Sequence, residues 1–212
     1  LHGNPVDAVA DEQEAIRQAL RHPIGSAPLK DVVQAGDTVA IIVSDITRLV
    51  HTAQMLPVIV DELNQAGVRD EQITVVTAQG THRAHTPEED VTVCGEDMVK
   101  RVKVVSHDCR DASQLTKIGT TTHGNDVYLD SHVVQADKVI LTGAVSFHPM
   151  AGFGGGRKAV LPGVASYETI MRNHAMALTD AFGGGCNPKC ETSLLEDNPL
   201  HDDMKQAAAL LN

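Results

Sequence analysis

The sequence predicts an α/β domain with a mostly parallel sheet flanked by helices, a Rossmann-like three-layer arrangement. Short apolar runs rich in β-branched residues, typical of strands buried on both faces, recur along the chain. Segments with helical periodicity separate these runs, and such alternation favours a parallel sheet. The 212 residues include no Trp, two Tyr and three Phe, so the core must be aliphatic. These three observations together indicate the fold class.

The first half of the chain supplies two helix–strand pairs. Residues 7–22 have apolar positions at helical spacing and predict an amphipathic helix. Residues 38–44 (TVAIIVS) predict a buried strand. Residues 51–65 predict the next helix, and residues 73–78 (ITVVTA) predict a second buried strand.

The middle of the chain continues the alternation. Residues 87–100 predict a helix with a proline in its first turn, and residues 102–106 predict a third strand. Residues 126–134 alternate in polarity and predict a strand, either internal or at an edge. Residues 138–145 (KVILTGAV) predict a further buried strand.

The last third is richer in glycine. Loops are expected at residues 152–156 and 183–185, and a helix at residues 166–178. A final helix is expected from Asn198 to the last residue. Because no linker interrupts this pattern, residues 1–212 are expected to form one domain.

Composition narrows the function classes. The chain is 42% hydrophobic and 21% charged, with a net charge of -11. An acidic surface does not suit nucleic acid or an anionic membrane as a partner, although a small anionic ligand needs only a local positive pocket. No run of 18 apolar residues predicts a membrane helix. We therefore expect a cytoplasmic protein; composition does not predict its oligomeric state.

The four cysteines do not have the spacing of a standard zinc site. They are expected to be reduced thiols, as is usual in the cytoplasm. The close pair Cys186 and Cys190 leaves metal binding or oxidation open as alternatives.

Polar residues follow several predicted strands. Asp45 and Arg48 come after the first strand, His82 after the second, and His148 after the last long apolar run. Ligands bind beyond the carboxyl ends of the strands in open α/β sheets, so a site is expected at this edge. Each residue also has a simpler interpretation: helix capping for Asp45, an ion pair for Arg48, a loop hydrogen bond for His82. His107, after the third strand, is expected to be structural.

A glycine-rich segment precedes a cationic pair. Gly154, Gly155 and Gly156 lead into Arg157 and Lys158, and such glycines allow backbone N–H groups to approach an anion. The segment matches neither the Walker A motif nor the GxGxxG fingerprint. It predicts a phosphate site, with a flexible loop as the alternative.

Taken together, these segments resemble the nickel-pincer-dependent lactate racemase family, in its N-terminal domain. The resemblance covers almost the whole chain and consists of separated motifs in the same order: residues 44–48 (SDITR), 80–83 (GTHR), 148–163, Asn173-His174 and 198–204 (NPLHDDM).

The resemblance implies a cofactor. In that family a nickel ion is held by a pincer nucleotide, a pyridinium thioamide/thiocarboxylate mononucleotide bound covalently to a lysine that Lys158 matches. His174 matches the one protein ligand of the nickel. The glycines 154, 155 and 156 are expected beside the cofactor. Cofactor-synthesis proteins are implied as partners.

The resemblance also implies the reaction, which is racemisation or epimerisation of a 2-hydroxy acid. His82 and His148 match two histidines that act as acid and base. Asp45 and Arg48 match positions at the substrate end, with Arg48 a partner of the substrate carboxylate. Hydride transfer avoids a carbanion at a weakly acidic carbon.

Three alternatives remain. The family has a C-terminal domain that is expected to be absent from this chain, so the chain is either active or a fragment inactive without that domain. A non-enzymatic module that binds a nucleotide or phosphate through the glycine loop is a second alternative. A zinc hydrolase is a third, but the sequence has no HExxH motif. The choice among lactate and other 2-hydroxy acids stays open.

Overall fold

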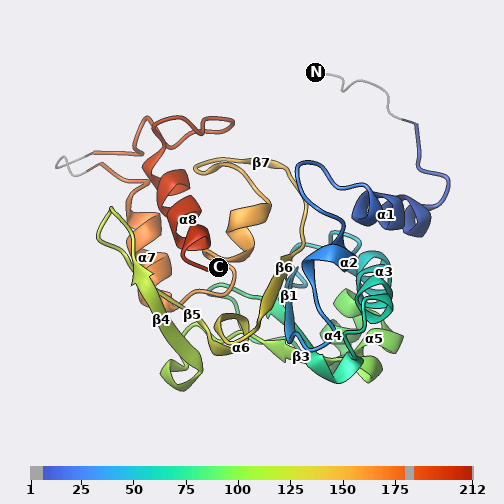
Figure 1. The fold of residues 1–212 in the computed structure, drawn as a ribbon. Coiled ribbons are helices and arrows are strands. Elements are labelled where there is room, and N and C mark those ends of the chain that lie inside the picture. Colours follow the sequence, from blue (N-terminus) through green and yellow to red (C-terminus); the bar gives the residue numbers. More distant parts are fainter. Residues whose placement is uncertain (1–6, 180–183, 212) are drawn as a thin grey trace.

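The structure is a computed structural model that describes residues 7–179 and 184–211. Its centre is a sheet of four parallel strands in the order β3-β2-β1-β6 (Figure 1). The strands are β1 (Val39–Ser44), β2 (Ile73–Ala78), β3 (Lys103–Ser106) and β6 (Lys138–Leu141). Helices flank this sheet, so the predicted fold class is confirmed.

The two faces of the sheet are covered differently. On one face, apolar residues of β1 and β2 pack against α3 (Thr52–Gln65), α4 (Pro87–Cys94) and α5 (Glu96–Arg101). On the other face, Ala40, Ile42 and Val76 pack against α6 (Ser131–Val134) and the segment around Val164. The helices α1 (Glu12–Arg21) and α2 (Leu29–Val32) lie on the first side (Figure 1).

The second half of the chain builds its own apolar cluster. The hairpin of β4 (Leu115–Thr120) and β5 (Asp126–Asp130) packs there with α7 (Tyr167–Ala175) and α8 (Pro199–Ala209). Two short strands, β7 (Phe147–His148) and β8 (Gly152–Phe153), form a second hairpin, and the 3-10 turn η3 (Gly156–Ala159) follows it. Figure 1 shows this half on the left of the sheet.

Several element boundaries differ from expectation, each for a local reason. The helix expected at residues 87–100 is divided at Gly95, whose φ of 92° ends α4 and begins α5. The strand expected at 138–145 ends at Leu141, two residues before Gly143 with its φ of 150°. The strand expected at 126–134 stops at Asp130, which caps α6 by accepting a bond from the His132 N–H.

Some elements were not predicted at all. The short helix α2, the β7–β8 hairpin and the η3 turn have too few residues for a clear periodic pattern. The strand β4 has six residues, but apolar and polar residues do not alternate in its sequence, LTKIGT. The last helix ends at Ala209 rather than at the final residue, which lies outside the described residues. The loop expected at 183–185 lies partly outside them as well.

Candidate functional site

A cavity of about 760 Å³ lies at the carboxyl ends of β1, β2 and β6. From β1 the chain passes to β2 and β3 on one side, and it later returns to form β6 on the other side of β1. The strand order therefore reverses between β1 and β6, and this is the switch point of the sheet. Ligands of open α/β sheets bind in the crevice beyond that point, and the volume is that of a small-molecule site.

The cavity brings together eight of the nine residues that the sequence singled out. They come from four separate segments and line one space: Asp45, Arg48, His82, His148, Gly154, Gly155, Lys158 and His174. Gly156, the ninth, is exposed and does not line the cavity.

Asp45 and His82 form a hydrogen-bonded pair within the cavity. Asp45 follows β1 and is 2% exposed, and its Oδ2 lies 2.5 Å from His82 Nδ1. Its Oδ1 accepts bonds from the N–H and the hydroxyl of Thr47. All of these partners donate, so the carboxylate fixes the proton of His82 on Nδ1 and leaves Nε2 with a lone pair.

His85, a second histidine in the same loop as His82, supports this pair. Its side chain is 1% exposed. Its Nδ1 contacts Asp90 Oδ1 at 2.9 Å, and its Nε2 accepts a bond from the N–H of Ile46. The ring therefore holds the turn that carries Asp45. The only signal in the sequence is its proximity to His82, because the contact depends on the fold.

His148 ends β7 and has the opposite arrangement at its ring. Its Nδ1 accepts bonds from the backbone N–H groups of Met150, at 3.2 Å, and Ala151, at 3.0 Å. Burial, together with the charges of Lys158 and Arg48, lowers the pKa of His148 to about 4. This imidazole is therefore neutral near pH 7.

Lys158 lies on the η3 turn and is an unusual amine. Burial, together with the nearby charges of Arg48 and Arg157, lowers its pKa to about 8. About a tenth of this amine is therefore unprotonated at pH 7, far more than in an ordinary lysine, which makes it a better nucleophile. The same three cations give the cavity a local positive charge in a chain of net charge -11.

His174, on α7, has its Nδ1 3.0 Å from the carbonyl oxygen of Ile170. A carbonyl can only accept, so Nδ1 carries the proton and Nε2 has a free lone pair, the form that binds a metal. The preceding residue, Asn173, is fully buried and donates to Asp203 Oδ2 and to the carbonyl of Leu200 on α8. These bonds fix the helix that presents His174.

The glycine loop differs from the phosphate cradle that the sequence suggested. The N–H of Gly154 donates to the carbonyl of Ser146 and is not turned toward a ligand. A Cβ on Gly155 would lie 3.1 Å from the carbonyl oxygen of Ala144, and its φ is 78°. The glycines therefore let the loop pack closely against residues 144–146, and this contact places Lys158.

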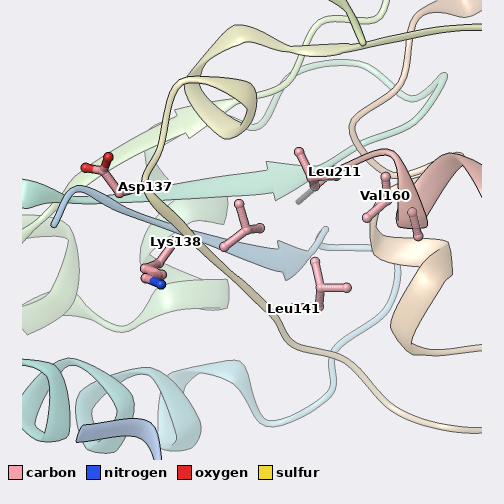
Figure 2. A pocket seen from close by; sticks show the side chains of 7 residues that line it. Asp137, Lys138, Leu141, Val160 and Leu211 are labelled. Carbon is pink, nitrogen blue, oxygen red and sulfur yellow. The ribbon is translucent and has the colours of Figure 1, made fainter. Parts of the chain in front are cut away.

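Two further findings limit where a metal or a ligand could be held. Within residues 7–179 and 184–211, no three His, Cys, Asp or Glu side chains converge as a metal site, so His174 needs ligands from a bound group to hold a metal. A smaller hollow of about 230 Å³ lies at the free edge of β6, where Figure 2 shows Leu141, Val160 and Leu211 around it. The ionisable groups at this hollow are Asp137 and Lys138, and none of the candidate site residues lines it.

His107, expected to be structural, lies outside the cavity lining and is 1% exposed. Its two ring nitrogens contact Asp130 Oδ2 and the carbonyl of Ala165. Cys186 is exposed, Cys190 is buried, and both are free thiols. Within the described part of the chain, no helix has the length and apolar character needed to cross a membrane.

The fold and the cavity define a class: an α/β domain with a cavity lined by histidines at the switch point of a parallel sheet. Residues 1–183 match the family described as lactate racemase N-terminal domain. The chain belongs to this family.

Similar proteins agree. The chain is 35% identical over 201 residues to the lactate racemase of Thermoanaerobacterium thermosaccharolyticum, covering 95% of the chain and 46% of that protein. It is 38% identical over 197 residues to the lactate racemase of Lactiplantibacillus plantarum, covering 93% and 45%. The chain thus spans about half the length of these relatives.

Solved structures give the same fold. The lactate racemase apoprotein of T. thermosaccharolyticum superposes with a TM-score of 0.86 at 35% identity, covering 95% of this chain and 47% of that one. A protein from Thermotoga maritima superposes with a TM-score of 0.67 at 22% identity, covering 99% and 49%, and shows the fold alone.

Proposed function

We propose that the protein racemises or epimerises a 2-hydroxy acid of the lactate type by reversible hydride transfer. The observation that carries the proposal is the cavity itself, where three imidazoles with defined ring-nitrogen partners surround a lysine of lowered pKa. The two relatives named lactate racemase support this reaction class.

The residues suit a nickel-pincer nucleotide as cofactor. A lysine whose pKa is about 8 supplies the neutral amine that a covalent link requires, and Lys158 would hold the pyridinium through it. The free Nε2 of His174 would bind nickel, and the sulfur- and carbon-rich pincer would supply the other ligands, which suit a softer metal. When bound, this group supplies the acceptor for the substrate hydride.

The remaining side chains act on the substrate. Arg48 binds the carboxylate, since a guanidinium matches it in a bidentate way. His82 takes the hydroxyl proton at Nε2, and Asp45 stabilises the imidazolium that forms. The C2–H bond breaks as hydride and the O–H bond as a proton, which leaves a 2-keto acid. Return of the hydride to the opposite face of C2, and of the proton to the oxygen, gives the other enantiomer.

The same proposal implies a longer active polypeptide, partner proteins and a cellular location. Because the chain spans about half of its relatives, we propose that racemisation requires the longer polypeptide, with a C-terminal domain over the cavity. Cofactor-synthesis proteins are its partners. Four free thiols fit a cytoplasmic location.

The alternative, a module that binds a nucleotide or phosphate without catalysis, rests on the glycine loop. The N–H of Gly154 is bonded within the chain, and Gly156 lies outside the cavity. That alternative also leaves the ring-nitrogen partners of His82 and His174 unexplained. The racemase interpretation accounts for more of the site.

Intact mass spectrometry with nickel analysis tests the cofactor. The full-length polypeptide is produced together with the cofactor-synthesis proteins, and chiral chromatography follows the conversion of L-lactate and other 2-hydroxy acids. We expect a covalent adduct with nickel, lost in Lys158→Ala and kept in Lys100→Ala, a lysine paired with Glu96 on the surface. An adduct that persists in Lys158→Ala would refute the attachment site, and a loaded enzyme inert toward every 2-hydroxy acid would refute the function.

A further inference from the structure

We propose that His148 is held as the Nε2–H tautomer, opposite to His82, and acts on the substrate as a hydrogen-bond donor rather than as a base in the resting protein. This role rests on the proposed function, but the tautomer follows from geometry alone.

The ring of His148 faces two obligatory donors. The N–H groups of Met150 and Ala151 both point at its Nδ1, at 3.2 and 3.0 Å. A backbone N–H can only donate, so Nδ1 must accept with its lone pair and carries no proton. A neutral imidazole has one N–H, and the remaining proton is therefore on Nε2. A 180° flip of the ring would put carbon in place of Nδ1 and lose both bonds.

Two side chains from outside this turn, one of them far along the chain, fix these donors. Asn198 Nδ2 donates to the carbonyl of Met150 at 2.9 Å. This carbonyl belongs to the peptide unit whose N–H, from Ala151, bonds His148, so the two bonds polarise each other. Arg157 donates to the carbonyls of Ala151 and Phe153 and so holds the β7–β8 hairpin. The polar cradle around Nδ1 is thus built from three segments of the chain.

His148 does not take up a second proton at neutral pH, so its tautomer stays opposite to that of His82. A second proton would have to enter at Nδ1, against two N–H groups and beside Lys158, Arg48 and Arg157, the cations that with burial hold the pKa of His148 near 4. The ring therefore remains neutral, with its proton on Nε2, under ordinary conditions.

His82 and His174 have the other arrangement. Their Nδ1 atoms face acceptors, Asp45 Oδ2 and the carbonyl of Ile170, so each presents a bare Nε2. Of the two cavity histidines assigned to acid–base chemistry, only His82 can take a hydroxyl proton at once. The substrate O–H bond breaks and an N–H bond forms on His82 Nε2, while His148 Nε2–H donates to a substrate oxygen. A neutral imidazole that donates in this way polarises a carbonyl without ionising.

Long-range ¹H–¹⁵N NMR of the ¹⁵N-histidine-labelled apoprotein at pH 7 reads each tautomer directly. We expect a protonated Nε2 and an unprotonated Nδ1 for His148, and the reverse for His82 and His174, with signals assigned by His148→Gln, His82→Gln and His174→Gln. A protonated Nδ1 on His148 would overturn the proposal. The measurement needs neither cofactor nor turnover, so it stands apart from the test of racemase activity.

The donor role has its own readout in the loaded full-length enzyme. A glutamine amide can place an N–H where the Nε2–H of histidine lies, but it cannot take a proton. His148→Gln should therefore lower kcat by only about 10-fold, whereas His82→Gln should lower it by about 1,000-fold. Equal losses of kcat in the two variants would overturn the donor role. A loaded wild-type enzyme without activity would instead contradict the proposed function.

Discussion

Asp45 illustrates how one buried side chain sets the chemistry of another. Its two carboxylate oxygens are used differently, since Oδ1 accepts from Thr47 and Oδ2 faces His82. The sequence assigned Asp45 to the substrate end. In the structure Asp45 lines the cavity and bonds the imidazole, and we propose that it also positions His82 and stabilises its charge.

Asp45→Asn should lower kcat by about 1,000-fold or more in the loaded full-length enzyme. The N–H of Thr47 can only donate, so the amide oxygen must replace Oδ1 and the amide NH₂ must face His82 Nδ1. The ring then changes tautomer and loses its free Nε2 lone pair. Steady-state kinetics measure the loss. Thr47→Val, which removes one of three bonds to Asp45, should cost less than about 10-fold; equal effects would contradict this role.

Lys158, the proposed attachment site of the cofactor, lowers the stability of the folded protein. Its ammonium form is buried beside Arg48 and Arg157, which is the reason that its pKa falls to about 8. Lys158→Met should therefore raise the free energy of unfolding of the apoprotein by about 1–3 kcal/mol at pH 7. Urea denaturation measures it.

The advantage of Lys158→Met depends on pH with a defined sign. The folded protein releases the Lys158 proton near pH 8, whereas the unfolded chain keeps it to about pH 10.5, so wild-type stability rises between these values. The difference between the two proteins should shrink over this window. Lys100→Met, at an exposed pair with Glu96, should change stability by less than about 0.5 kcal/mol. A variant less stable than wild type at pH 7 would contradict the argument.

At the scale of elements, the start of α8 connects the second apolar cluster to the site. Asn198 caps this helix through its Oδ1, which accepts from the His201 N–H, and its Nδ2 donates to the carbonyls of Met150 and Leu194. The residue is fully buried. The matching motif at residues 198–204 therefore contributes through placement, since neither Asn198 nor Asp203 lines the cavity.

Asn198→Ala should lower the free energy of unfolding by about 2–3 kcal/mol, because it removes a helix cap and leaves buried carbonyls without partners. Asn198→Asp keeps the cap but loses both donors, and the two variants together separate these contributions. Urea denaturation followed by circular dichroism measures them. Ser113→Ala, in an exposed turn, provides the control. If Asn198→Asp had the same free energy of unfolding as wild type, the bond from Asn198 to Met150 would not contribute to stability.

At the scale of the whole molecule, a buried contact between an imidazole and a carboxylate joins the sheet to the second half of the chain. His107 follows β3 and contacts Asp130 Oδ2, at the end of β5, and the carbonyl of Ala165. Burial alone would raise the pKa of Asp130, but the bonds from His107 and His132 outweigh it and lower the pKa. The two apolar clusters thus meet at a polar contact with little freedom.

Asp130→Asn should lower the free energy of unfolding by about 1–3 kcal/mol at pH 7, since it replaces the buried carboxylate that His107 and His132 contact. The folded pKa of Asp130 is below its ordinary value of 3.8, so its contribution is present above that pH and is lost as the pH falls further. The gap between wild type and variant should narrow below about pH 4. Urea midpoints from pH 7 to pH 3.5 check this.

The control for that series is Asp126→Asn. Asp126 also has a lowered pKa, through Lys117 and Thr120, but its ion pair is exposed. It should change the urea midpoint little at any pH. A loss as large as that of Asp130→Asn would mean that burial is not the cause.

The periodic patterns of the chain predicted the parallel sheet and its longer helices because these elements depend on local sequence. Strands β1 and β2 were recognised from buried β-branched runs, and α3 from helical spacing. The β7–β8 hairpin was missed because two-residue strands carry no pattern. The strand β4 was missed because apolar and polar residues do not alternate in its sequence, LTKIGT. The resemblance, together with the polar residues after the strands, identified the residues that gather in the cavity.

The sequence by itself determined the fold class, the family and the residue types of the site, since these are written in local patterns and motifs. Only the tertiary structure decided the strand order, which sets the switch point, and the partner of each imidazole. Asp45 reaches His82 across 37 residues, and Asn198 reaches Met150 across 48. The proton position on a histidine depends on such contacts, because a ring nitrogen takes the role that its partner leaves to it.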